Sequence, residues 1–207
     1  QCHYIPLEGV ENNLFSAYGY MEDKRGQLWV ATLGNGIIRY DEASGMFKPY
    51  LSTANTTWTT SIYYDKYNDK IYCGTYDGIR WFSPTDPKRK VHTIGPNAVV
   101  YSIARISSEE LVFGSTNGII VLNTKTGKTR NISTQQGLPS NNIFTVQPYG
   151  NGQLWMSSSS GLIHYDLKTG TMETYTVRDG LQGNEFYKNS SMKSRDGRIW
   201  FGGVNGI

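Results

Sequence analysis

The residues best suited to ligand chemistry are polar side chains that stand beside aromatic ones at glycine turns. Asn35, Asp77 and Asn205 each come directly before a glycine, and Tyr76 precedes Asp77. Amides and carboxylates supply paired hydrogen-bond donors and acceptors, and an aromatic ring offers a flat apolar face. A carbohydrate needs both kinds of group. The same residues also suit tight turns, so a purely structural role is the alternative for each of them.

A second set of polar residues lies in joints between predicted sheets. Residues 137–142 read Gly-Leu-Pro-Ser-Asn-Asn, residues 179–186 read Asp-Gly-Leu-Gln-Gly-Asn-Glu-Phe, and residues 9–13 carry a shorter version. Trp58 stands apart within Thr-Thr-Trp-Thr-Thr and could serve as a stacking platform or as a plug between sheets. The predicted ligand-binding residues are Asn35, Trp58, Tyr76, Asp77, Asn141, Asn142, Arg178, Asn184, Glu185 and Asn205.

Catalytic chemistry has little support in the sequence. His3, His92 and His164 fall at unrelated positions of the pattern described below, and no nucleophile elbow, zinc-protease or phosphate-loop motif occurs. Cys2 and Cys73 form no metal or redox spacing, and Cys73 takes a position that is otherwise apolar, as expected of a small core residue. We therefore predict no catalytic residue, no metal and no cofactor.

A sequence repeat predicts the strands and turns that position these candidate residues. Short apolar runs that end in small residues begin at Leu28, Ile71, Leu111, Leu154 and Ile199, roughly 40 to 45 residues apart. This period is the size of a four-stranded propeller blade. In the fourth repeat, strands are expected at 143–147, 154–158, 162–165 and 172–176, separated by polar turns.

These units predict an all-β fold, a β-propeller with about four full blades and a partial one. The turn between the second and third strands and the joint between blades then share one face of the ring, which places the candidate residues on a common rim. Aromatic positions such as Trp29, Trp155 and Trp200, with Tyr72 and Val112 in the other repeats, are expected to fill the layers between blades. The predicted blades span residues 14–50, 58–95, 99–133, 143–176 and, incomplete, 186–207.

The first and last residues of the sequence allow two hypotheses about the ring. Residues 3–6 look like a lone fourth strand and Ile207 like the start of a third. The lone strand could complete the last blade and close a five-bladed ring. Alternatively, and as the favoured reading, the chain is a portion of a larger ring.

The joints, together with Asp-x-x-Gly-x-Leu-Trp-Val-Ala-Thr at residues 23–32 and Gly-Leu-Ile-His-Tyr-Asp at residues 161–166, resemble the two-component-regulator propeller repeat. Residues 180–186 and 195–207 are similar to its closing unit. The resemblance covers essentially the whole chain. It implies the periplasmic sensor region of a hybrid two-component histidine kinase, an inner-membrane protein.

The resemblance also implies partners and a mechanism. An immunoglobulin-like domain and further blades would adjoin this segment, the parent protein would form a homodimer, and an oligosaccharide or other small ligand would be the input. The chain itself would be non-catalytic and would signal to a kinase outside it. Two alternatives stay open: a protein-binding propeller scaffold, and an enzyme similar to the streptogramin-degrading propeller lyases, which rely on histidine and a divalent ion.

The composition agrees with an all-β protein and disfavours nucleic acid as a binding partner. Aromatic residues make up 13% of the 207 residues and charged residues only 18%, and glycine occurs 23 times, which disfavours a helical bundle or a disordered chain. The net charge is +3, and the basic residues are scattered apart from residues 88–90, so nucleic acid is not an expected partner. No apolar run approaches the length of a membrane span.

Overall fold

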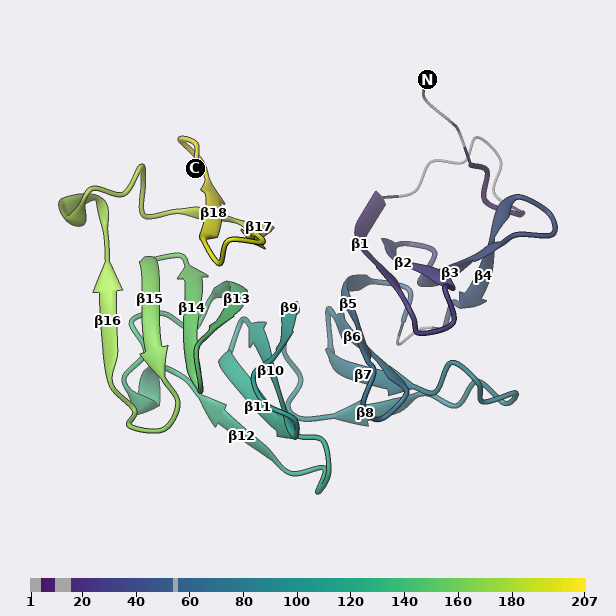
Figure 1. The fold of residues 1–207 in the computed structure, drawn as a ribbon, viewed down its shortest axis with the longest axis horizontal. Coiled ribbons are helices and arrows are strands. Elements are labelled where there is room, and N and C mark those ends of the chain that lie inside the picture. Colours follow the sequence, from purple (N-terminus) through teal and green to yellow (C-terminus); the bar gives the residue numbers. More distant parts are fainter. Residues whose placement is uncertain (1–4, 10–15, 54–55) are drawn as a thin grey trace. The chain divides into compact units, whose positions relative to one another are not determined.

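The computed structural model describes residues 5–9, 16–53 and 56–207, and these residues form two compact units, Gln1–Ile94 and Gly95–Ile207. Both units consist of antiparallel sheets, as predicted (Figure 1). The predicted strand at residues 3–6, the joint at residues 9–13 and the start of the blade at residue 14 extend outside the described residues, and His3 lies outside them. No helix in the described ranges is long and apolar enough to cross a membrane.

The first unit contains two four-stranded meanders in which each strand pairs with the next. One sheet comprises β1 (Ser16–Glu22), β2 (Leu28–Leu33), β3 (Ile37–Asp41) and β4 (Met46–Leu51). The other comprises β5 (Thr59–Asp65), β6 (Lys70–Thr75), β7 (Gly78–Phe82) and β8 (His92–Ile94).

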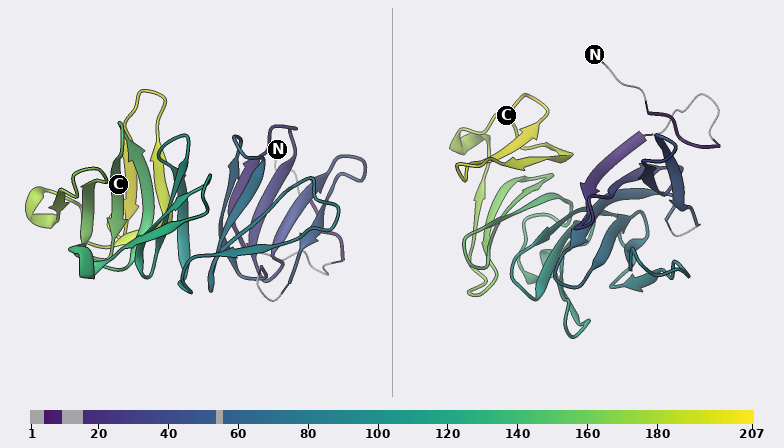
Figure 2. Two further views of the ribbon diagram at one scale, coloured as in Figure 1. Left: turned by 90° about the horizontal axis from the view of Figure 1, so that it is seen from below. Right: turned by 45° about the vertical axis from the view of Figure 1, so that its right-hand side comes forward.

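The second unit contains two further meanders and a two-stranded sheet. The third sheet comprises β9 (Val100–Arg105), β10 (Glu110–Ser115), β11 (Gly118–Asn123) and β12 (Thr129–Ile132). The fourth comprises β13 (Ile143–Tyr149), β14 (Gln153–Ser158), β15 (Gly161–Asp166) and β16 (Met172–Tyr175), close to the four predicted strands. The last comprises β17 (Phe186–Lys193) and β18 (Ile199–Gly203). β9, β13 and β17 are the first strands of the three sheets of this unit, and β13 contacts both β9 and β17. Figure 2 shows the strands of each sheet side by side.

The turns between the second and third strands require glycine for a steric reason. Gly36, Gly118 and Gly161 all have positive φ, and a Cβ on any of them would collide with a backbone carbonyl oxygen, that of Leu51 in the case of Gly36. Only glycine combines this conformation with so close an approach. The sequence pattern therefore fixes where each third strand begins.

The joints after the third and fourth sheets share one local fold. Residues 134–136 and 177–179 form short 3-10 helices, capped by Ser133 and Thr176, and each is followed by a left-handed glycine, Gly137 or Gly180. In both, the capping side chain and the third helical residue exchange hydrogen bonds with the backbone, which is a capping box. The two Gly-Leu joints are thus hydrogen-bonded turns of the same form.

Aromatic packing between sheets agrees with the prediction at three of the five repeat positions. Trp29, Tyr72 and Val112 are fully buried. Trp155 is only half-buried, and Trp200 is 43% exposed, so the expectation that these two fill buried layers was wrong for this chain. The physical reason is that each ring borders an open hollow, Trp155 together with Phe201 and Trp200 together with Met192 and Ile207, so both rings keep contact with solvent.

Candidate functional site

Four of the predicted binding residues come together in the first unit, around Trp58. The Gly34 and Gly36 N–H groups both donate to the carbonyl oxygen of Thr57, which places the turn that carries Asn35 beside Trp58. On the other side, the Tyr76 N–H donates to the Trp58 carbonyl oxygen at 3.3 Å. Within the first unit, the turns that carry Asn35 and Tyr76 therefore both lie beside the segment that carries Trp58.

Trp58 and Tyr76 form an exposed pair of rings. Their centroids lie 6.0 Å apart at an interplanar angle of 68°, and the residues are 53% and 49% exposed. Trp58 is therefore not buried as a plug between sheets. Large rings held open to solvent are suited to stacking on an apolar face of a ligand.

Charged and hydroxyl groups border this ring pair. Asp77 accepts a hydrogen bond from Thr75 Oγ1 at 2.7 Å through Oδ1 and pairs with Arg80 Nη2 at 2.9 Å through Oδ2. Arg80 is only 5% exposed, whereas the Asp77 side chain is partly open to solvent. The ion pair therefore fixes an accessible carboxylate to a buried guanidinium. The cluster of Asn35, Trp58, Tyr76 and Asp77, here called the Trp58 platform, combines stacking and hydrogen bonding.

In the second unit, two predicted residues use their side chains to hold the joints. Asn141 Oδ1 accepts a hydrogen bond from the Thr134 N–H at 2.8 Å, and Asn184 Oδ1 accepts one from the Val177 N–H at 2.9 Å. Their carbonyl oxygens accept from the turn glycines Gly118 and Gly161. Both asparagines thus tie a joint to the neighbouring turn.

The remaining candidates lie along the same joints and turns. Asn142 accepts from the Ser159 N–H through its carbonyl, and Glu185 accepts from Val204 in the same way. Asn205 bonds Gln182 through both its backbone N–H and its side-chain amide, at 2.9 and 3.1 Å. Arg178 is exposed on the second joint. These residues all belong to the second unit, whereas the Trp58 platform belongs to the first.

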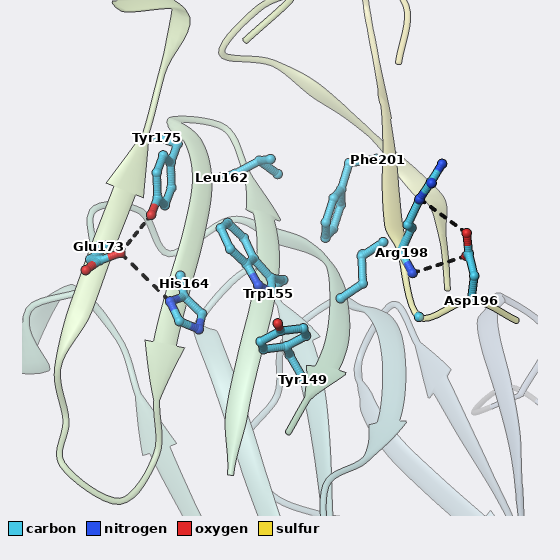
Figure 3. A pocket seen from close by; sticks show the side chains of 11 residues that line it. Tyr149, Trp155, Leu162, His164, Glu173, Tyr175, Asp196, Arg198 and Phe201 are labelled. Atoms are coloured by element: carbon cyan, nitrogen blue, oxygen red, sulfur yellow. Dashed lines mark hydrogen bonds and ion pairs between the residues drawn. The ribbon is translucent and has the colours of Figure 1, made fainter. Parts of the chain in front are cut away.

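A hollow of about 780 Å³ that the sequence did not point to opens in the second unit (Figure 3). Trp155 stacks on His164 with centroids 4.7 Å apart and lies 5.3 Å from Tyr175. Glu173 accepts a hydrogen bond from the Tyr175 hydroxyl and lies 3.9 Å from His164 Nδ1. The repeat pattern assigned Trp155 to the core, whereas its ring is only half-buried and lines this hollow.

The two described histidines each stack on a tryptophan, and the described cysteine is buried. His92 stacks on Trp81 with centroids 4.0 Å apart, as His164 does on Trp155. Cys73 is buried, and burial raises the pKa of its thiol well above the ordinary value, because the thiolate would lose its solvation. Among the described residues, no group of three or more His, Cys, Asp or Glu side chains could hold a metal ion.

No protein-family model and no curated protein sequence matches the chain. Several solved structures do match the chain. The extracellular domain of BT4673, described as a hybrid two-component system of B. thetaiotaomicron, superposes with a TM-score of 0.74 at 19% identity, over 96% of this chain and 26% of that one. The corresponding domain of BT3049 from the same organism gives 0.61 at 19% identity, over 92% and 33%.

An enzyme shares the fold as well. A catalytically inactive virginiamycin B lyase from Staphylococcus aureus, solved with quinupristin, superposes with a TM-score of 0.70 at 17% identity, over 95% of this chain and 66% of that chain. This chain spans only about a quarter to a third of the two-component domains. At these identities the likeness concerns the fold, and the chain has the all-β fold of a propeller segment.

Proposed function

We propose that this chain is a ligand-binding part of an extracytoplasmic sensor, and that the Trp58 platform binds carbohydrate. The fold supports the sensor role, because extracellular domains of two-component systems share it over nearly the whole chain. The single observation that carries the ligand class is the exposed Trp58–Tyr76 ring pair with Asp77 at its edge.

The chemistry of the platform matches a sugar ring better than a purely apolar or purely charged ligand. A pyranose has an apolar C–H face that stacks on an aromatic ring and a rim of hydroxyl groups that need donors and acceptors. Trp58 and Tyr76 supply the faces, while Asn35 and Asp77 supply the polar partners. The Asp77–Arg80 pair keeps the carboxylate oriented before the ligand arrives, which lowers the entropic cost of binding.

Signalling in this proposal is non-catalytic. Ligand binding shifts the population between two arrangements of a larger, dimeric membrane-anchored sensor, and the shift passes to a histidine kinase outside this chain. The energy for the switch comes from the difference in ligand affinity between the two states. The segment includes the blades predicted at 14–50, 58–95, 99–133 and 143–176 with the partial one at 186–207. In the second unit, Asn142, Arg178, Glu185 and Asn205 are the further candidates for ligand contact.

The test is binding of a panel of plant, host and microbial oligosaccharides, measured by isothermal titration calorimetry. For the glycan that binds, Trp58→Ala and Tyr76→Ala should each weaken the affinity by at least about tenfold, as expected for a stacking residue. Tyr67→Ala is the matched control, since Tyr67 is 60% exposed at the β5–β6 hairpin, at the other end of the same sheet from Trp58. Its affinity should be unchanged.

Two results would overturn the proposal. One is the absence of binding across the panel by a protein that is shown to be folded. The other is glycan binding that survives both platform substitutions. Turnover of a virginiamycin-type antibiotic that is lost on His164→Ala would instead establish the lyase alternative.

A further inference from the structure

An asparagine followed by a glycine is a dipeptide at which a protein chain can modify itself. The glycine nitrogen can attack the asparagine side-chain carbonyl, because glycine has no Cβ to obstruct the approach. The sequence contains this pair four times, at residues 35–36, 117–118, 151–152 and 205–206. All four asparagines lie in turns or bends, so the dipeptide sequence does not distinguish them. The hydrogen bonds of each turn do.

Three of the four pairs hold the attacking nitrogen in a hydrogen bond. The glycine N–H donates to a backbone carbonyl oxygen in each: Gly118 to Asn141 at 2.7 Å, Gly36 to Thr57 at 3.3 Å and Gly206 to Gly203 at 3.3 Å. Such a nitrogen has to give up its bond before it can attack, which raises the barrier. Gly118 is the most firmly held, because its hydrogen bond is the shortest and a Cβ there would collide with the Ile132 carbonyl oxygen.

The fourth pair lies at the tip of the β13–β14 hairpin and has no such restraint. Asn151 is exposed, and the glycines on either side of it, Gly150 and Gly152, have φ of +59° and +85°. Among the residues that the structure describes, neither the Gly152 N–H nor the Asn151 side-chain amide has a hydrogen-bond partner. Both reacting groups are therefore open to solvent and to each other.

We propose that Asn151 is a site of spontaneous deamidation, with water as the only co-reactant. The Gly152 nitrogen gives its proton to water or hydroxide and bonds to Cγ of Asn151. The bond from Cγ to Nδ2 breaks, and Nδ2 leaves as ammonia, which closes a cyclic imide. Water then opens the imide at either carbonyl and yields aspartate or isoaspartate at residue 151. The net change is the uptake of water and the release of ammonia, without oxidation or reduction.

The surroundings of the hairpin tip favour this reaction and define its consequence. A Cβ on Gly152 would lie 3.2 Å from Lys168 Cε, so the lysine side chain runs beside the reacting backbone. A nearby ammonium favours both the deprotonated nitrogen that attacks and the carboxylate that forms. The Gly152 carbonyl accepts from the Leu167 N–H at 2.9 Å. Isoaspartate adds a carbon to the backbone before Gly152 and would displace this acceptor.

Peptide mapping of the folded protein tests the proposal. The protein is kept in mildly alkaline buffer, samples are digested with trypsin over time, and mass spectrometry with electron-based fragmentation distinguishes asparagine, aspartate and isoaspartate. The four pairs fall in separate tryptic peptides, 26–39, 106–125, 131–168 and 199–207, so each rate is measured in the same sample. Conversion at Asn151 should be at least about tenfold faster than at Asn117, because attack at Gly118 requires the loss of a hydrogen bond.

Two controls separate the effect of the fold from that of the sequence. In concentrated urea the rates at Asn151 and Asn117 should converge, since the hydrogen bonds that distinguish the turns are gone. The variant Asn151→Gln is the matched control in the folded protein, because its longer side chain would have to close a larger and less favourable ring. Peptide 131–168 of this variant should stay unconverted over the same time.

Three results would overturn the inference. The first is equal conversion at Asn151 and Asn117 in the folded protein. The second is a difference between these two sites that persists unchanged in urea, since the fold would then not be its cause. The third is conversion of peptide 131–168 that continues in the Asn151→Gln variant, which would place the reaction at another residue. None of these results depends on ligand binding at the Trp58 platform.

Discussion

The indole Nε1 of Trp29 donates a hydrogen bond to Oδ2 of Asp23 at 3.2 Å, and both side chains are buried. The other oxygen of Asp23 accepts from the backbone N–H groups of Arg25 and Gln27 at 2.8 and 3.3 Å. One carboxylate therefore closes the β1–β2 hairpin and anchors the aromatic layer between two sheets.

Asp23→Ala should lower the free energy of unfolding by about 2 kcal/mol, because the indole N–H and two hairpin N–H groups lose a buried acceptor. Urea denaturation followed by tryptophan fluorescence measures the change. Asp196→Ala is the control: this carboxylate pairs with Arg198 at 3.2 Å on the surface and should leave the stability nearly unchanged. Equal effects of the two substitutions would contradict the anchoring role.

The joint asparagines should contribute to stability. Asn141→Ala removes the acceptor for the Thr134 N–H and should cost about 1 kcal/mol of unfolding free energy, the usual loss for a helix cap. Asn142→Ala, one position along, should be nearly neutral because Asn142 is exposed. Thermal denaturation of both variants tests this, and a larger loss for Asn142 than for Asn141 would show that the joint is held differently.

Two glycines with nearly equal φ should tolerate alanine very differently. Gly36 and Gly45 have φ of +69° and +67°, but a Cβ meets the Leu51 carbonyl only at Gly36 and nothing within 4 Å at Gly45. Gly45→Ala should cost about 1 kcal/mol for the left-handed backbone alone. Gly36→Ala should cost at least about 2 kcal/mol more, because the strand β4 must move. Chemical denaturation distinguishes the two, and similar midpoints would refute the steric argument.

Asp41 should titrate well below an ordinary aspartate. The hydroxyl of Ser44 and then the ammonium of Lys48 stabilise its charged form and hold its pKa at about 2, against 3.8 without them. Since the folded-state pKa is the lower one, the stabilisation is present above about pH 4 and is lost as the pH falls toward 2. NMR titration of the Asp41 carboxyl carbon should show this value, and Ser44→Ala should raise it more than Lys48→Met does. An Asp41 pKa near 3.8 in the unaltered protein would contradict the prediction.

Much of the fold could be predicted from the sequence, because strands and turns are encoded locally. Alternating apolar residues specify one buried face, and glycines such as Gly118 mark backbone conformations that other residues avoid. The repeat of these signals predicted the meanders, and the strand β14 begins within one residue of its expected start. The place of Tyr76 and Asp77 in the turn between a second and a third strand also followed, whereas the ring contact of Trp58 with Tyr76 did not, because the sequence left Trp58 open as a stacking platform or a plug.

What the tertiary structure alone decided is which equivalent residues are covered and which polar groups are already engaged. Trp29 and Trp155 hold the same place in their repeats, yet only Trp29 is fully buried, because its cover, Phe82, comes from another sheet far along the chain. Likewise, the position of Asn141 in the sequence allows its side chain to bind a ligand. In the structure, however, its Oδ1 already accepts a hydrogen bond from the Thr134 N–H. Local sequence determines the shape of each strand and turn, whereas burial and hydrogen-bond satisfaction depend on contacts between distant segments, which no short window of sequence contains.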